Sequence, residues 1–499
     1  MEAAGLGLAV FGVVDTCLKY GAVIIKKYKD FKEAENEIQE RVTSIQATWR
    51  KISQQLGLLK RVWGTLDEDF RDLQERMLRI LQTKLDSAVS QISKLEKRSP
   101  SRSRGQEKRK AARYALDIKK SLDTAILDLQ VWERKFDPTW FLILRATSPN
   151  ITPAIDESLT KSPDTTTLSA ARHIRDALKE EPKRRTSVFL PEDKLLCAQR
   201  SRVLLSTFEV CKIPDSKTFI LDSVECDPRT DASTFAKDVR ALAQKLQNID
   251  PFQFNLLSCL GVVRSKDSVT RKYLSFNFIF RMPPNCRGPQ TLRSHLCGTN
   301  RSLSDKVTLA KQLATSVSYL HVLDFVHKGI RPETALILQA NDSQNLHLFL
   351  LGFKTFRTAE GKTMRLGNSE WAENIYQHPE RQGISPIVDY TMQHDIYSLG
   401  VCLLEIGLWG SFITREGHIN LPAVYAEIDI PTLARNGFLK DHFTELAKND
   451  LPSKIGDKYA QVVANCLTCM DDTNEDFGDL SQFEDEDGIL IGVKFIEKV

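Results

Sequence analysis

Apolar residues recur at alternating steps of three and four along the N-terminal part of the chain, the spacing of one helix face. Short connections join the three stripes, which favours antiparallel neighbours in an all-α bundle. The same spacing would suit a coiled-coil dimer, so that alternative stays open. The stripes are Ile38, Val42, Ile45, Trp49, Ile52, Leu56 and Leu59; Leu73, Met77, Leu81, Leu85, Ala88, Ile92 and Leu95; and Tyr114, Ile118, Leu122, Ala125, Leu129 and Trp132.

A fourth helix is predicted at the start of the chain, where the sequence is unusually apolar. No residue from Ala3 to Val14 is charged, and apolar residues continue to Ile25. No stretch reaches the roughly 20 apolar residues that cross a bilayer as a helix. An apolar first helix suits a bundle core as well as a membrane, so both interpretations stay open. The residues that would insert into a membrane are Leu6, Leu8, Val10, Phe11, Val13 and Val14.

The domain boundaries are predicted from changes in composition. Thr65 to Glu68 has the pattern of a capping box that begins the helix of the second stripe. Residues 146–190 are rich in Ser, Thr and Pro, although Leu168–Lys179 can form a short brace-like helix. We therefore expect a four-helix bundle over residues 1–145, a linker over 146–190, and a separate domain over 191–499.

The second half mixes strand and helix patterns. Leu346–Leu351 is typical of a buried strand, whereas Val307–His321 is typical of a long amphipathic helix. The predicted fold class is therefore a multidomain chain, with an all-α bundle followed by an α+β domain.

Residues 327–336, His-Lys-Gly-Ile-Arg-Pro-Glu-Thr-Ala-Leu, resemble the catalytic loop of protein kinases, usually His-Arg-Asp-Leu-Lys-Pro-Glu-Asn-Ile-Leu. Residues 352–354 follow a predicted strand at the place of Asp-Phe-Gly. His378-Pro-Glu380 resembles Ala-Pro-Glu, and Asp395–Glu405 resembles the kinase helix that follows. These motifs occur in the family's order and spacing, so the resemblance implies a bilobal kinase-like fold. Its expected structural residues are His327, Phe353, Glu380 and Asp395.

The same resemblance implies that the catalytic residues are lost. Gly329 stands where the proton-accepting Asp would be, Thr334 where the magnesium-binding Asn would be, and Gly352 where the metal-binding Asp would be. Thr218–Val224 resembles the kinase strand that carries the ATP-anchoring lysine, but no Lys occurs from Thr218 to Ala236. Phe235–Leu246 resembles the kinase helix that follows, with Asp238 where the partner Glu of that lysine would be. Residues 195–211 contain no glycine for a phosphate loop. We therefore predict a pseudokinase with no catalytic residue, no ATP or magnesium cofactor and no metal. An active kinase with displaced catalysts is the alternative.

Charge and cysteine content bear on the class of partner and on the cellular compartment. A net charge of +4 over 499 residues does not argue for nucleic-acid binding. The ten cysteines lie mostly in apolar contexts, as reduced buried thiols do in a cytoplasmic protein. The single CxxC, Cys466 to Cys469, has no second pair beside it and is better explained as a packed helix end.

One strongly basic segment lies between the second and third stripes. It could bind anionic lipid headgroups, at roughly 1 kcal/mol per basic residue near the surface, or serve as a solubilising loop or nuclear-import signal. Its basic residues are Lys97, Arg98, Arg102, Arg104, Lys108, Arg109, Lys110 and Arg113.

The opening Met-Glu-Ala-Ala-Gly-Leu-Gly-Leu-Ala-Val-Phe-Gly-Val-Val and the helical pattern after it resemble the HeLo (prion-inhibition and propagation) domains of filamentous fungi. Combined with a kinase-like half, the architecture is also similar to mixed-lineage kinase-domain-like proteins. The resemblance implies a pseudokinase that restrains a membrane-active bundle in heterokaryon-incompatibility cell death. The chain has no Asn/Gln-rich tail, so prion self-templating is not expected.

That interpretation implies a protein partner or upstream activator, anionic membrane lipid, and a homo-oligomer in the active state. The chain would be cytoplasmic and recruited to the plasma membrane on activation. A non-catalytic scaffold that oligomerises through the bundle and binds clients through the pseudokinase is the competing hypothesis. The regulatory phosphorylation sites that we consider are Thr355, Thr358, Thr363 and Ser369.

Overall fold

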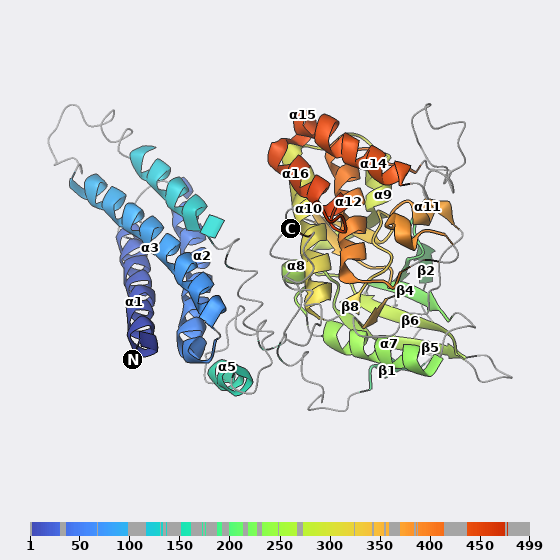
Figure 1. The fold of residues 1–499 in the computed structure, drawn as a ribbon, viewed down its shortest axis with the longest axis horizontal. Helices are drawn as coiled ribbons and strands as arrows, with labels where there is room; N and C mark the ends of the chain where they lie inside the picture. Colours follow the sequence, from blue (N-terminus) through green and yellow to red (C-terminus); the bar gives the residue numbers. More distant parts are fainter. Residues whose placement is uncertain are drawn as a thin grey trace. The chain divides into compact units, whose positions relative to one another are not determined.

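The computed structural model divides into two compact units, Met1–Asp176 and Ala177–Val499 (Figure 1). It describes residues 2–29, 36–66, 68–97, 116–129, 131–132, 136, 151–160, 172, 175, 187–191, 199–212, 218–226, 232–247, 249–266, 273–323, 325–341, 344–353, 356–358, 370–383, 386, 388–413, 437–474 and 477. The basic segment from Arg98 to Arg113 and the candidate phosphorylation sites Thr355, Thr363 and Ser369 lie outside these residues.

The first unit is helical. Its described elements are α1 (Glu2–Lys29), α2 (Asn36–Val62), a 3-10 turn (Trp63–Thr65), α3 (Glu68–Lys97), a helix over 116–129, and α5 (Ile151–Thr160). Helix α1 packs against both α2 and α3, and α5 packs against α2. The N-terminal part of the chain is therefore an all-α region, as the periodicity predicts.

The predicted stripes form the core wherever their side chains are described. Every stripe residue from Ile38 to Leu59 is buried, as are Met77 to Ile92 and Ile118 to Trp132. The side chains of Leu73, Leu95 and Tyr114 lie outside the described ones. On α1, Val14, Cys17, Gly21 and Ile24 are buried, and they share one helix face.

Polar contacts fix the helix over 116–129 against its neighbours. The Trp132 indole N–H donates to the Met77 carbonyl of α3 at 2.7 Å. Lys84 of α3 pairs with Asp128 at 2.6 Å, and Arg41 of α2 pairs with Asp123 at 2.7 Å. Buried apolar stripes set the stability of this unit, because partly exposed ion pairs contribute only about 0–1 kcal/mol each.

Two sequence-based expectations need correction. Helix α3 begins at Glu68, and the Thr65 hydroxyl donates to the Val62 carbonyl at 2.6 Å, so Thr65 closes the preceding turn instead of capping α3. Residues 151–160 are helix α5, not linker, and Ile155 and Leu159 are buried. The Ser, Thr and Pro content concealed α5, although Pro153 lies in its first turn, where proline is tolerated. Of the brace-like helix predicted over 168–179, only residues 172 and 175 are described, and both are helical.

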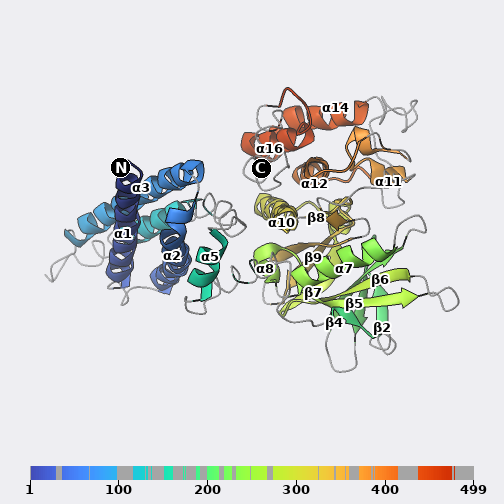
Figure 2. The same cartoon turned by 60° about the horizontal axis from the view of Figure 1, so that its bottom comes forward.

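The second unit is an α+β region built on a six-stranded sheet of order β1-β5-β6-β4-β3-β2. The pairs are antiparallel except β1 with β5, which is parallel. Helix α7 (Ala232–Leu246) packs against β5 and β6, and it crosses one face of the sheet (Figure 2). The strands are β1 (Phe189–Leu190), β2 (Gln199–Arg202), β3 (Glu209–Lys212), β4 (Thr218–Glu225), β5 (Cys259–Lys266) and β6 (Tyr273–Arg281).

A mainly helical part follows the sheet. Helix α10 packs against α12 and against β10, and α12 packs against α15 and α16. Two small sheets, β10-β9-β7 and β11-β8, lie beside these helices. The elements are α8 (Pro251–Phe254), β7 (Cys286–Thr291), α9 (Leu292–Leu296), α10 (Leu303–Val322), β8 (Phe325–Val326), β9 (Ala335–Ala340), β10 (Leu346–Leu350), β11 (Arg357–Thr358), α11 (Trp371–Asn374), a 3-10 turn (Pro379–Arg381), α12 (Met392–Leu408), α14 (Phe438–Glu445), a π turn (Leu446–Asp450), α15 (Leu451–Ile455) and α16 (Asp457–Leu467).

A search for membrane-spanning segments among the described residues finds no helix that is both long and apolar enough to cross a bilayer.

Candidate functional site

The loop between β8 and β9 is held by Asp395, which lies fully buried in the first turn of α12. Its carboxylate accepts the backbone N–H groups of His327 at 2.7 Å and Lys328 at 2.9 Å. It also bonds the His321 ring at 3.0 Å and accepts the Tyr390 hydroxyl at 2.7 Å. Burial would raise the pKa of Asp395, but these partners hold it below its ordinary value. Asp395 therefore remains a buried anion that shapes the loop.

His327 connects this loop to the end of β10. Its Nδ1 accepts the Gly329 N–H at 3.2 Å, so Nε2 carries the proton and donates to the Leu351 carbonyl at 2.8 Å. Burial lowers the pKa of His327 to about 4, which keeps the ring neutral. The ring also packs on Phe353, with centroids 5.3 Å apart. His327 and Phe353 are thus in direct contact inside the second unit.

The structure brings together Gly329, Thr334 and Gly352, the three positions at which the sequence resemblance predicts the catalytic residues of a kinase. The Thr334 hydroxyl accepts the Arg331 N–H at 3.1 Å and lies 3.0 Å from the Gly329 carbonyl, to which it can donate. Gly352 has φ +82°, and a Cβ there would lie 2.4 Å from Cγ2 of Thr334. A Cβ at Gly329 would meet nothing closer than 3.8 Å. Gly352 is therefore required by backbone and packing, whereas Gly329 is not.

Asp222 also belongs to this site, although the sequence pattern did not identify it as a site residue. It lies on β4, 1% exposed, and its Oδ2 accepts the N–H groups of Gly352 at 2.9 Å and Phe353 at 3.0 Å. Burial raises the pKa of Asp222 to about 6, although the two N–H donors favour the charged form. The available signal was a carboxylate inside the apolar run Phe-Ile-Leu-Asp, because a buried acid needs a partner.

Aromatic rings fill the space around this contact. Phe353 lies 6.2 Å from Phe278, 6.1 Å from Phe280 and 6.0 Å from Phe356, measured between ring centroids. Phe235 of α7 packs on Phe356 at 5.8 Å. The segment after β10 is therefore held to the sheet by packed rings as well as by Asp222. Asp238, at the place of the expected kinase Glu, lies half-buried on α7.

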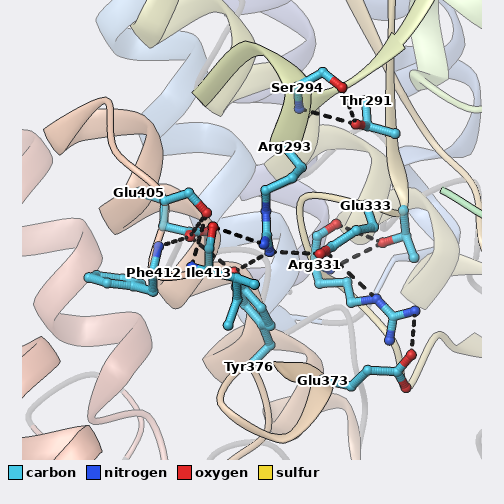
Figure 3. A network of polar contacts seen from close by, with 12 residues as sticks. Thr291, Arg293, Ser294, Arg331, Glu333, Glu373, Tyr376, Glu405, Phe412 and Ile413 are labelled. Atoms are coloured by element: carbon cyan, nitrogen blue, oxygen red, sulfur yellow. Dashed lines mark hydrogen bonds and ion pairs between the residues drawn. The ribbon is translucent and has the colours of Figure 1, made fainter. Parts of the chain in front are cut away.

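A second buried polar network centres on Arg293 of α9 (Figure 3). Its guanidinium donates to the Tyr376 hydroxyl at 2.7 Å and pairs with Glu333 at 2.8 Å. Tyr376 in turn donates to Glu405 at 3.0 Å, and Glu405 also accepts the Phe412 N–H at 2.7 Å. Burial raises the pKa of Glu405 to about 7, although Arg293 opposes that shift.

Arg331 occupies the basic position of the catalytic-loop motif and is already engaged. It pairs with Glu373 of α11 at 2.9 Å and lies 3.8 Å from Glu333 (Figure 3). The site as a whole thus offers a hydroxyl, a buried carboxylate and paired cations. Among the residues that the structure describes, no pair of exposed carboxylates lies at Gly329, Thr334 and Gly352.

Glu380 lies in a cluster that has metal-ligand residue types. Its carboxylate is 3.6 Å from Nδ1 of His378, and ligand atoms of Glu380, His378 and His394 lie within 4.8 Å of one another. However, Nδ1 of His394 accepts the Thr391 N–H at 2.9 Å, which places its ring proton on Nε2. That nitrogen has no free lone pair for a metal, so we do not assign a metal site here.

A pocket of about 810 Å³ opens at the ends of β3 and β4, beside residues 281–289. Lys212, Arg281 and Arg287 line it together with apolar side chains, and none of its described lining residues is acidic. It does not include Asp222 or Gly352, and it is therefore separate from the catalytic-loop positions.

The remaining candidate residues are only partly described. Val14 is buried and Val13 half-buried on α1, whereas the side chains of Leu6, Leu8, Val10 and Phe11 are not described. Lys97 ends α3, and Thr358 pairs with Phe325 through β11. Those assignments therefore remain predictions.

Comparison with known proteins finds partial relatives, among them two protein kinases. A LEAF RUST 10 disease-resistance locus receptor-like protein kinase-like protein from Arabidopsis thaliana is 22% identical over 227 residues, which are 43% of this chain and 32% of the relative. Serine/threonine-protein kinase 33 from Bos taurus is 27% identical over 99 residues, 19% of this chain and 20% of that kinase. The chain contains a kinase-like region. The α+β architecture of the second unit is compatible with it, although the matches span at most about a third of either relative.

No family model matches the chain. The resemblance of the N-terminal helices to HeLo domains, and a fungal source, therefore stay predictions from the sequence.

Proposed function

We propose that the kinase-like region is a catalytically inactive regulator of the N-terminal helical unit. The observation that carries this proposal is the contact of Asp222 with the N–H groups of Gly352 and Phe353. The Asp222 carboxylate lies on the strand where a kinase would carry its phosphate-anchoring lysine. It accepts hydrogen bonds from residues 352–353, which correspond to the segment that would hold magnesium in a kinase. Nucleotide phosphates are anions, so a buried carboxylate at this place repels them instead of binding them.

The adjacent positions support the same proposal. Phosphoryl transfer needs carboxylates that hold magnesium and orient the attacking hydroxyl. Thr334 uses its hydroxyl within the loop, and Gly352 packs too closely on Thr334 to accept a side chain. The chemistry of the chain therefore favours a structural role for this site, not catalysis.

Magnesium and ATP should leave the thermal unfolding midpoint of the full chain unchanged. A ligand at 100 times its dissociation constant stabilises a protein by about 2.7 kcal/mol, which is a shift of several degrees. Differential scanning fluorimetry with and without Mg·ATP measures this, with an active serine/threonine kinase as the positive control. A clear Mg-dependent shift, or incorporation of labelled phosphate, would favour the active-kinase alternative.

We further propose that the helical unit acts on anionic membranes when α1 is released. The supporting feature is the contact of α1 with α2 at Gly21, where an added Cβ would lie 1.9 Å from the Trp49 ring. Val14, Cys17, Gly21 and Ile24 of α1 are buried in this arrangement. The uncharged stretch from Ala3 to Val14 gives the helix an affinity for apolar surroundings. Two packings a few kcal/mol apart would make such a switch.

Gly21→Leu in the full chain is expected to destabilise the helical unit by about 1–3 kcal/mol through overpacking. The released α1 should then increase dye leakage from vesicles that contain anionic lipid. Gly12→Leu is the matched control, because nothing lies within 4 Å of a Cβ at Gly12. Adding Leu8→Asp to Gly21→Leu should abolish the leakage if α1 is the active segment.

The competing scaffold function predicts a different outcome. Gly21→Leu would then change the oligomeric state in sedimentation experiments without any leakage, since a stripe with this spacing can also join helices of separate chains. Absence of leakage from vesicles of every anionic composition would reject the membrane function and retain the scaffold.

A further inference from the structure

The start of the second unit is attached to the edge of its sheet by residues 187–191. Strand β1 pairs in parallel with β5, and the Val262 N–H donates to the Val188 carbonyl at 2.8 Å. This approach requires Gly261, because a Cβ there would lie 2.7 Å from the Val188 oxygen and 2.8 Å from the Leu190 side chain. The edge strand β5 therefore accommodates β1 closely, because Gly261 leaves room for its backbone and for Leu190.

Both faces of the strand make contacts. Leu190 packs on the apolar cluster of the sheet on one side. On the other, Phe189 lies 6.4 Å from the Phe276 ring, and two guanidinium groups lie over Phe189. The Arg264 group is 4.2 Å and the Arg240 group 5.3 Å from the ring centroid. Neither arginine has an ion pair with a carboxylate in the described part of the chain.

Ser187 lies two positions before Phe189. The chain bends at Val188 between them, and strand β1 begins at Phe189. The Ser187 side chain is exposed, and its Oγ accepts the Phe189 N–H at 3.2 Å. The hydroxyl therefore lies beside the residue whose ring carries Arg240 and Arg264. In the sequence, Arg184 and Arg185 precede it by three and two positions.

We propose that Ser187 is a phosphorylation site for an ATP-dependent serine kinase that recognises basic residues before its target, and that Arg240 and Arg264 bind the phosphate. The Ser187 oxygen forms a bond to the γ-phosphorus of ATP while the bond to the β-phosphate oxygen breaks. ADP leaves, and the hydroxyl proton passes to the modifying kinase. The phosphate adds nearly two negative charges beside two guanidinium groups, which form strong bidentate contacts with such oxygens.

Phosphorylation would hold β1 against β5 at the edge of the sheet. The boundary between the units falls at Asp176 and Ala177, only ten residues before Ser187. Each residue released from the sheet edge adds up to about 3.3–3.6 Å of free chain. Phosphorylated Ser187 would therefore limit how far residues 187–191 extend from the sheet edge, whether or not the helical unit acts on membranes.

The test uses the full chain, Mg·ATP and a purified cyclic-AMP-dependent protein kinase, with mass spectrometry to locate the phosphate. Hydrogen exchange of the Val262 amide then reports docking, because that N–H bonds to Val188. Phosphorylation is expected to slow this exchange by roughly three- to tenfold. Arg240→Gln with Arg264→Gln should remove the slowing, whereas Arg287→Gln, on another strand, should retain it.

Two further variants keep the result interpretable. Gly261→Ala should give fast Val262 exchange with or without phosphate, and Arg240→Gln alone, at an exposed site, should reduce the slowing without impairing folding. The proposal is overturned if Ser187 stays unmodified in the folded chain. It is equally overturned if phosphate accelerates the exchange or slows it in the absence of both arginines.

Discussion

Replacing Arg293 by methionine is expected to lower the free energy of unfolding by about 3–5 kcal/mol, because it leaves buried charge without its partner. Arg293 is 2% exposed, and Glu405 is fully buried at the other end of the Tyr376 bridge. Without the guanidinium, Glu405 must take up a proton, and Glu333 loses its ion pair at 2.8 Å. Urea unfolding monitored by intrinsic fluorescence measures the loss.

The control for this prediction is Arg287→Met, an exposed arginine whose replacement should change stability by less than about 0.5 kcal/mol. A second variant tests the cause. Adding Glu405→Gln to Arg293→Met should restore part of the stability, since the neutral amide needs no cation. A loss below about 1 kcal/mol for Arg293→Met alone would show that the network contributes little.

Asp222 is the second residue at which a large effect is expected. Asp222→Ala should destabilise the protein by about 2–5 kcal/mol, because the N–H groups of Gly352 and Phe353 both lose their acceptor in a buried place. Asp222→Lys should destabilise it more, since a buried cation would face two N–H donors. Asp222→Asn keeps an acceptor oxygen and should fold.

The pH dependence of Asp222→Asn follows from the raised pKa. The folded-state pKa of Asp222 is about 6, above its ordinary value of 3.8, so the folded protein binds this proton more tightly than the unfolded chain does. The contribution of Asp222 to stability is therefore fully present below pH 3.8 and is lost as the pH rises through 6. Relative to wild type, Asp222→Asn should gain about 1 kcal/mol at pH 4.5 and about 3 kcal/mol at pH 7.5.

Denaturant titrations of both proteins across this pH range give the comparison. Glu405 also has a raised pKa and affects both proteins alike, so it cancels in the difference. The two N–H donors could stabilise the charged carboxylate more than burial destabilises it. The difference in unfolding free energy between Asp222→Asn and wild type would then become smaller as the pH rises, which would contradict the prediction.

Local patterns predicted the secondary structure well where burial alone decides it. The stripe from Ile38 to Leu59 faces the core because a helix with a single apolar face can bury its apolar side chains only by turning that face inward. The patterns failed at Thr65 and over residues 151–160. A threonine hydroxyl can cap the following helix or close the preceding turn, and a segment rich in Ser, Thr and Pro can be a linker or a short helix. Choosing between them needs the neighbouring element: the Val62 carbonyl for Thr65, and helix α2 for α5.

The motif around His327 to Thr334 could be found from the sequence because its residues are consecutive. The residues that form hydrogen bonds with this site from other elements are distant in the chain. Asp222 is 130 residues from Gly352, and no periodicity or spacing relates a carboxylate on one strand to two N–H groups beyond another. The same holds for Arg293 and Tyr376, which are 83 residues apart.

The sequence by itself determined which helices have an apolar face, and that residues 327–336 resemble a kinase catalytic loop with Gly329 and Thr334 where the resemblance predicts a proton acceptor and a metal ligand. Only the tertiary structure decided that a carboxylate from β4 occupies the site, and that Gly352 has no room for a side chain. Residue types are set along the chain, whereas burial, hydrogen-bond partners and pKa depend on which distant segments are brought into contact.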